Sequence, residues 1–144
     1  MSAVDLETEL ALAQDEDAAR TAATHAGATL ESSATGIYWL TMRAPDGERY
    51  VARIAWTRYP DHAPSVKFAP EVDGPLDQTS AWPLIPGYRA GNYDICQPFT
   101  AEGQAVHSEW GTGPEAWPAT GNCLLWVVEQ LLHDITDRYQ GRSG

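Results

Sequence analysis

The sequence predicts a single α+β domain: an N-terminal helix, a four-stranded antiparallel meander sheet, a long loop carrying a cysteine, and a helix that crosses the sheet. Three observations support this prediction. Apolar residues recur at helical spacing near both ends of the chain, strand-like patterns fill residues 29–68, and prolines interrupt residues 70–91. The 144 residues suffice for one core, so we assign residues 1–144 to one domain with a flexible tail from about residue 140.

The composition excludes several classes of function. The formal net charge of -11 opposes binding to nucleic acid or to an anionic membrane, because both require a basic surface. No apolar run is long enough to span a bilayer, and the N-terminus lacks the basic and apolar regions of a signal peptide. We therefore expect a cytoplasmic protein with reduced thiols, which argues against a Cys96–Cys123 disulfide.

The first helix is predicted from Val4 to about Thr24. Ser2 and Asp5, three residues apart, resemble a capping box, and the acidic residues of the first turns suit the helix dipole. The apolar stripe of this helix is expected to consist of Leu6, Leu10 and Ala13. Gly27 ends the helix.

Four strands are expected next. Residues 29–32 have a weak strand pattern, whereas residues 37–42 are rich in the aromatic and β-branched residues that favour strands. Pro45-Asp46-Gly47 forms a turn, since proline presets φ and glycine adopts positive φ. In the third strand, Tyr50, Ala52, Ile54 and Trp56 are expected on one face, and Arg53 and Thr57 on the other. Val66 and Phe68 share one face of the fourth strand.

Two long loops flank Cys96. Residues 70–91 contain prolines that block a helix, and apolar side chains that argue against disorder, so we expect an ordered loop lying on the sheet. Residues 100–116 form a second loop, with His107 and several glycines. Long irregular loops in compact domains are often functional, which places the chemistry in this part of the chain.

The strongest helix signal follows Trp117-Pro118. Thr120 is positioned to cap a helix, and Cys123 falls on its apolar side. The apolar residues that recur at three- and four-residue steps are Leu124, Leu125, Val128, Leu131, Leu132 and Ile135. We expect this helix and Trp117 to be buried against the sheet face that carries Ile54.

The order of these elements and three motifs resemble the ubiquitin-conjugating enzyme (UBC) family. Tyr59-Pro60 with the following 63–68 segment resembles the family's Tyr-Pro, Pro-Pro, Val and Phe pattern between the third and fourth strands. Ile95-Cys96 resembles its Ile-Cys active site. Trp117-Pro118-Ala119, with the helix after it, resembles its Trp-Ser-Pro motif and crossing helix. The resemblance covers roughly residues 4–137.

The chain also departs from the family. Pro86-Gly87-Tyr88 stands at the spacing of the family's His-Pro-Asn, and the spacers on both sides of Cys96 are longer than usual. The two C-terminal helices of the eukaryotic enzymes are not expected. In these respects the chain is similar to divergent bacterial relatives that accompany activating-enzyme, ubiquitin-like and peptidase proteins in conjugation operons.

The resemblance implies a ubiquitin-conjugating-like acyl transferase that needs no cofactor and no metal. Cys96 would accept the C-terminal acyl group of a ubiquitin-like modifier protein from an activating-enzyme-like protein, hold it as a thioester, and pass it to a target protein. Neither nucleic acid nor a membrane is an expected partner. The modifier's tail would cross a shallow groove whose wall candidates are Trp82, Leu84, Tyr88 and Phe99.

Other residues are candidates for supporting roles. Asn92 and Asn122 can supply an amide donor for an oxyanion, although each also suits a turn or a helix cap. His107 is a candidate base or acceptor-orienting residue. Asp134 and Asp137 fall where the family has an acidic residue beside its cysteine, although solvated charge equally explains them at a helix end.

Other interpretations stay open. A zinc site of Cys96, His107, Cys123 and His133 would lack close Cys-x-x-Cys spacing, and a papain-like cysteine–histidine pair would lack an orienting third residue. The main alternative is a catalytically inert UBC/RWD-like module that binds a ubiquitin-like or activating protein. The missing His-Pro-Asn favours this alternative, whereas the cysteine favours the enzyme.

Overall fold

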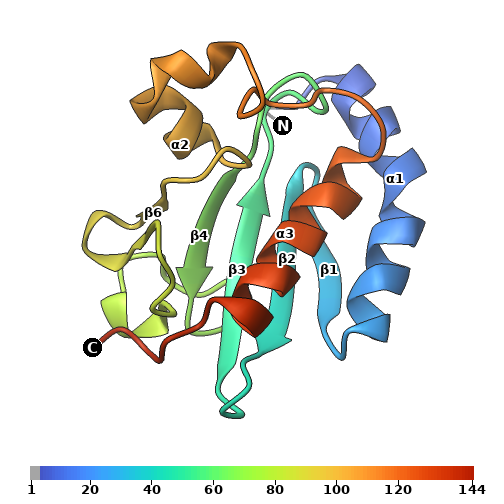
Figure 1. Ribbon diagram of the computed structural model, residues 1–144. Coiled ribbons are helices and arrows are strands. Elements are labelled where there is room, and N and C mark those ends of the chain that lie inside the picture. The colour runs from blue at the N-terminus through green and yellow to red at the C-terminus, as the bar shows by residue number, and fades with distance from the viewer. Residues whose placement is uncertain (1–3) are drawn as a thin grey trace.

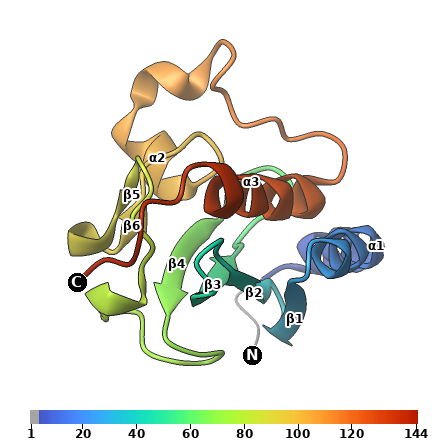
Figure 2. The same cartoon turned by 60° about the horizontal axis from the view of Figure 1, so that its bottom comes forward.

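The computed structural model describes residues 4–144 and has the expected α+β architecture (Figure 1). Its four-stranded antiparallel sheet, in the order β1-β2-β3-β4, consists of β1 (Thr29–Ala34), β2 (Ile37–Arg43), β3 (Arg49–Ala55) and β4 (Ser65–Ala69). Helices α1 (Leu6–His25) and α3 (Cys123–Asp137) lie side by side on one face of this sheet (Figures 1 and 2). A short hairpin, β5 (Tyr88–Arg89) and β6 (Asp94–Ile95), and helix α2 (Ala101–Val106) lie beside β4.

Helix α1 buries a different face from the one expected. Asp5 caps the helix, since its carboxylate accepts the Thr8 N–H at 2.8 Å; Ser2, expected in a capping box, lies outside the described residues. The predicted stripe of Leu6, Leu10 and Ala13 is wrong, because these side chains are exposed. The buried residues are Thr8, Leu12, Ala19 and Ala23. Their mostly small side chains allow α1 to pack closely on α3 and β1, so side-chain size outweighs hydrophobicity here.

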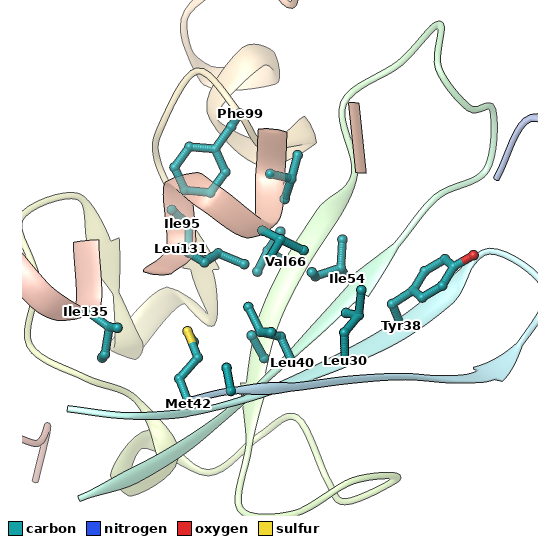
Figure 3. Close-up of a cluster of buried hydrophobic side chains, with 14 of the residues drawn as sticks. Leu30, Tyr38, Leu40, Met42, Ile54, Val66, Ile95, Phe99, Leu131 and Ile135 are labelled. Atoms are coloured by element: carbon teal, nitrogen blue, oxygen red, sulfur yellow. The ribbon is translucent and has the colours of Figure 1, made fainter. Parts of the chain in front are cut away.

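The sheet buries the face that the sequence predicts. Tyr50, Ala52 and Ile54 of β3 and Val66 and Phe68 of β4 are at most 1% exposed, and Trp56 is buried beside them. Figure 3 shows Leu40 and Ile54 from the sheet close to Leu131 of α3. The opposite face has a small cluster of its own. Trp39, Val51 and Ala69 are buried there beneath Val72 and Leu76 of the loop after β4.

Helix α3 supplies the other half of the core. Its buried apolar residues are Cys123, Leu124, Val127, Val128, Leu131 and Ile135. Asn122, not Thr120, is the N-cap, because Asn122 Oδ1 accepts the Leu125 N–H at 2.9 Å. Gly121, with φ at 73°, separates Thr120 from the first turn, which explains the error. Trp117 is half-buried rather than buried, and its indole N–H donates to the Pro60 carbonyl at 2.7 Å.

The loop expected at residues 100–116 is partly helical. Helix α2 begins after Thr100, whose side-chain oxygen accepts the Gly103 N–H at 3.0 Å. A 3-10 turn, Ser108–Gly111, follows it. The sequence does not signal this helix because it is only six residues long and contains a glycine.

The last residues differ from the free tail expected from about residue 140. The Leu84 N–H donates to the Gly141 carbonyl at 2.7 Å, and the Ser143 N–H donates to the Trp82 carbonyl at 2.9 Å. This segment therefore ties the loop before β5 to the end of α3. No helix within residues 4–144 is long and apolar enough to cross a membrane.

Candidate active site around Cys96

Cys96 follows directly on the β5–β6 hairpin, which fixes its backbone. Tyr88 pairs with Ile95 and Arg89 pairs with Asp94 in this hairpin. The guanidinium of Arg89 donates two hydrogen bonds of 2.8 Å to the Asp94 carboxylate. One step further along, the Cys96 N–H donates to the Gly87 carbonyl at 2.7 Å. The hydrogen-bonded strands thus hold the backbone of Cys96 in one place.

The hairpin is also anchored to the sheet and to α2. Lys67 of β4 donates its ammonium hydrogen to the carbonyl of Tyr93, in the turn of the hairpin. The hydroxyl of Thr100 donates to the carbonyl of Ile95, immediately before Cys96. Ile95 itself is fully buried. The cysteine therefore follows a rigid, anchored segment rather than a free loop.

The two cysteines of the chain have different surroundings. Both are free thiols, and Cys96 is half-buried whereas Cys123 is 1% exposed. The Cys123 thiol points to the carbonyls of Pro118 and Thr120 at 3.4 and 3.6 Å. Burial raises the pKa of the Cys123 thiol, which makes its reactive thiolate less available. Of the two cysteines, Cys96 is therefore the more accessible residue.

The ring of Tyr88 is buried in the core. Its hydroxyl donates to Asp134 of α3 at 2.8 Å. Desolvation raises the pKa of both groups above their ordinary values. Arg138 lies 4.0 Å from the same carboxylate. Asp134 is thus a buried brace between α3 and the hairpin, not the solvated helix-end charge that was the simpler expectation.

A cavity of about 400 Å³ opens beside the segment that follows Cys96. Its lining includes Gln97 and Phe99, together with Pro114, Glu115, Ala116 and Pro118. Trp126 and Asp134 of α3, and Arg138 directly after this helix, also line it. The cavity combines apolar and charged surface, and its lining begins at the residue after Cys96.

The structure does not assemble the predicted groove wall. Trp82 and Tyr88 are buried in the core, where both rings pack near Phe68. Leu84 is 44% exposed, and Phe99 lines the cavity just described. The error arises because aromatic residues in a proline-rich loop also serve to attach the loop to the sheet, which local sequence does not distinguish from a binding surface.

The predicted supporting residues lie apart from one another. Asn92 is exposed at the closed end of the hairpin, in the 3-10 turn Ala90–Asn92. The ring of His107 stacks on Trp110 at 4.0 Å, and its Nδ1 is 2.8 Å from Glu109. Asn122 caps α3, which is the alternative structural role expected for it, and it donates to the Asp15 carbonyl at 3.1 Å.

Asp137 and His133 form a pair at the exposed end of α3. His133 Nδ1 lies 2.8 Å from the Asp137 carboxylate, and both side chains are more than half exposed. Asp137 is thus explained by solvated charge. Within residues 4–144, no group of three or more His, Cys, Asp and Glu side chains is placed to hold a metal ion.

Sequence reasoning missed Gln97. Its side-chain Nε2 donates to the Pro86 carbonyl at 3.0 Å and lies against Gly87. Gly87 has φ at 89°, and a Cβ at this position would lie 2.3 Å from Nε2. The sequence contained a signal for this contact, because Gln97 directly follows Cys96 and Gly87 stands nine residues before Cys96.

Comparison with protein-family models, with curated proteins and with solved structures finds no match for this chain.

Proposed function

We propose that this protein is a ubiquitin-conjugating-like enzyme that carries a ubiquitin-like modifier on Cys96 and passes it to a target protein. The observation that carries the proposal is the half-buried Cys96, whose backbone N–H donates to the Gly87 carbonyl and which directly precedes the segment that lines the cavity. The order of elements, with α1, the four-stranded sheet, the cysteine hairpin and α3 in sequence, supports it as a UBC-like arrangement.

The chemistry takes place in two transfers. In the first, the Cys96 thiolate attacks the carbonyl carbon of the modifier's thioester on the activating protein, the old C–S bond breaks, and the donor sulfur leaves as a thiolate. In the second, a neutral amine or hydroxyl of the target attacks the Cys96 thioester and loses its proton to solvent, while Cys96 leaves as a thiolate. Neither transfer needs an oxidant, a reductant or a metal.

The shape of the site suits a bulky acyl group better than a small substrate. A folded modifier must remain outside the domain while its extended C-terminus reaches the sulfur. The anchored hairpin presents Cys96 at the surface rather than at the bottom of a pocket, and the cavity beside residues 97–99 leaves room for the tail or the acceptor. The partially exposed thiol therefore serves a protein substrate.

The proposal is tested by adduct formation in an ATP-supplemented extract of the native cells. The purified, tagged chain is added, recovered without reductant, and resolved on a non-reducing gel. We expect a heavier species that a thiol reagent removes, because a thioester exchanges with free thiols. Cys96→Ala should abolish this species, and Cys123→Ala should retain it, since the Cys123 sulfur is buried. An adduct that survives Cys96→Ala would refute the assignment.

The binding module is a second candidate, because Tyr88 at the family's asparagine position is turned into the core and offers no amide near Cys96. Such a module would bind a ubiquitin-like or activating protein without a covalent bond. The same extract experiment separates the two functions. An enzyme gives an ATP-dependent adduct on Cys96, whereas a binding module gives none, with wild type and Cys96→Ala behaving alike.

A further inference from the structure

We infer that Gln97 is a catalytic residue whose side-chain amide stabilises the oxyanion formed at the Cys96 thioester. The inference rests on the proposed acyl transfer. Attack on a thioester produces a tetrahedral intermediate with negative charge on oxygen, and a fixed amide N–H directed at that oxygen lowers the barrier. A donor is needed here because no asparagine occupies position 88.

The Gln97 amide is held beside Cys96 by its contacts with residues 86 and 87. Nε2 donates to the Pro86 carbonyl at 3.0 Å, which fixes the orientation of the amide. The neighbouring Gly87 carbonyl accepts the Cys96 N–H at 2.7 Å. The same Gly87 thus contacts both the cysteine backbone and the Gln97 amide, which brings an amide donor next to the acyl-carrying residue.

Gly87 makes this approach possible. A Cβ at residue 87 would lie 2.3 Å from Gln97 Nε2 and 3.1 Å from the Cys96 carbonyl oxygen. The first distance is far below van der Waals contact, so any other residue would displace the amide. The φ of 89° at Gly87 also favours glycine. The backbone here is shaped to accommodate the Gln97 side chain.

Gln97 retains hydrogen-bonding capacity that a nearby glutamine has used. An amide NH₂ group carries two hydrogens, and Gln97 gives one of them to Pro86. Gln104, in α2, gives both: its Nε2 donates to the Pro98 and Glu115 carbonyls at 2.9 Å each. Gln97 also lines the cavity that begins at the residue after Cys96, and the proposal directs its remaining hydrogen at the acyl oxygen on Cys96.

The residues expected to supply this donor are less well placed. Asn92 lies in the turn that closes the hairpin, whereas Cys96 lies beyond both paired positions at its open end. At about 3.3 Å per strand residue, this separation exceeds the reach of a hydrogen bond. The His107 ring is stacked on Trp110, with its Nδ1 at Glu109.

The inference is tested by single-turnover discharge of acylated protein. The acyl donor is a fluorescent peptide ending in Ala-Gly-Gly, supplied as its mercaptoethanesulfonate thioester, and the acceptor is free L-lysine. Discharge from Cys96 is compared with discharge from a short unstructured peptide that carries the same acyl group on its single cysteine. We expect wild type to discharge faster than the peptide, and Gln97→Ala to be ~10²–10³-fold slower than wild type.

Three further variants distinguish catalysis from folding. Gln97→Glu keeps the side-chain shape but replaces the donor with a carboxylate, so it should be as slow as Gln97→Ala. Gly87→Ala should displace the amide and slow discharge with Gln97 unchanged in the sequence. Gln104→Ala, which removes an amide with no spare hydrogen, should discharge like wild type. Thermal unfolding followed by circular dichroism identifies any variant that is not folded.

The outcomes separate this inference from the proposed function. If wild type outpaces the peptide and Gln97→Ala or Gln97→Glu discharges at the wild-type rate, Gln97 is not the donor and the proposed function stands. If wild type does not load on Cys96, or discharges no faster than the peptide, the proposed acyl transfer fails and the role of Gln97 fails with it. Loading passes through the same oxyanion, so Gln97→Ala is loaded to completion before discharge is timed. Slow discharge from fully loaded, folded Gln97→Ala supports both.

Discussion

At the scale of single residues, the two sulfurs offer a direct comparison. Cys96 is half-buried at the end of the anchored hairpin, and Cys123 is enclosed in α3 with a raised pKa. Alkylation needs an accessible thiolate, so iodoacetamide should label Cys96 at least about ten times faster than Cys123 in the folded protein. Peptide mass spectrometry of timed samples measures both rates. Equal rates in the absence of denaturant would contradict the placement of Cys123 in the core.

Asp134 is a buried carboxyl whose environment makes stability depend on pH. Its carboxyl is buried against Tyr88, with Arg138 and His133 nearby, and desolvation raises its pKa above the ordinary value of 3.8. The folded state therefore holds the proton more tightly than the unfolded state does. Stability contributed by this group is present below about pH 3.8 and is lost as pH rises through the raised pKa.

Replacing the carboxyl should remove this pH dependence. We expect the free energy of unfolding of wild type, relative to Asp134→Asn, to fall as pH rises from 3.8 towards neutral, and then to become constant. Urea denaturation of both proteins across this range measures the difference. A difference that increases with pH would show that the carboxylate is stabilised in its charged form, contrary to its burial.

At the scale of elements, the start of α3 depends on Asn122. Its Oδ1 accepts the Leu125 N–H, and its Nδ2 donates to the Asp15 carbonyl of α1, so it both caps one helix and joins two. Asn122→Ala should cost about 0.5–2 kcal/mol in the free energy of unfolding, as the loss of an N-cap does. Thr120→Ala should change it by no more than about 0.5 kcal/mol. Urea denaturation that shows the larger loss for Thr120→Ala would contradict this cap.

At the scale of the whole molecule, Tyr59 joins the two helices across the end of the sheet. Its hydroxyl accepts the Leu124 N–H of α3 at 2.9 Å and donates to Asp15 of α1. Tyr59→Phe leaves a buried N–H without its acceptor, which typically costs about 1–3 kcal/mol. Tyr139→Phe is the matched control, because its hydroxyl bonds Tyr50 and Asp46 near the surface. Urea denaturation of both variants measures the loss of unfolding free energy. A greater loss for Tyr139→Phe than for Tyr59→Phe would contradict the role of Tyr59 in joining α1 to α3.

The sheet was predictable because its signals are local. Apolar residues recur at every second position along residues 50–56 and at Val66 and Phe68, which is the pattern of a half-buried strand. The structure buries these apolar residues. The face of α1 was not predictable in this way, because Ala19 and Ala23 are buried only in the presence of α3 and β1. Side-chain size at a helix contact is a property of two elements, which one amphipathic pattern does not contain.

The candidate site was also predictable only where its sequence signal is local. Cys96 was predicted from its position between two long loops, and it is half-buried in the structure. The role proposed for Gln97 depends on Gly87, which the hairpin register brings opposite Cys96. The expected groove residues Trp82 and Tyr88 lie in the core because the loop that carries them folds back onto Phe68 and Asp134. Such pairings become visible only when the chain is folded.

The most direct test of the central claim is to identify the residue that carries the acyl group in the native cells. Cys96→Ser is expressed there, because an oxyester on the hydroxyl is more stable than a thioester and survives purification. After proteolysis, mass spectrometry should find residues 94–99 with the C-terminal residues of a second protein joined through an ester to the side chain at position 96. An acyl group on any other residue, or its absence from position 96 when the extract forms an ATP-dependent adduct with wild type, would contradict the account.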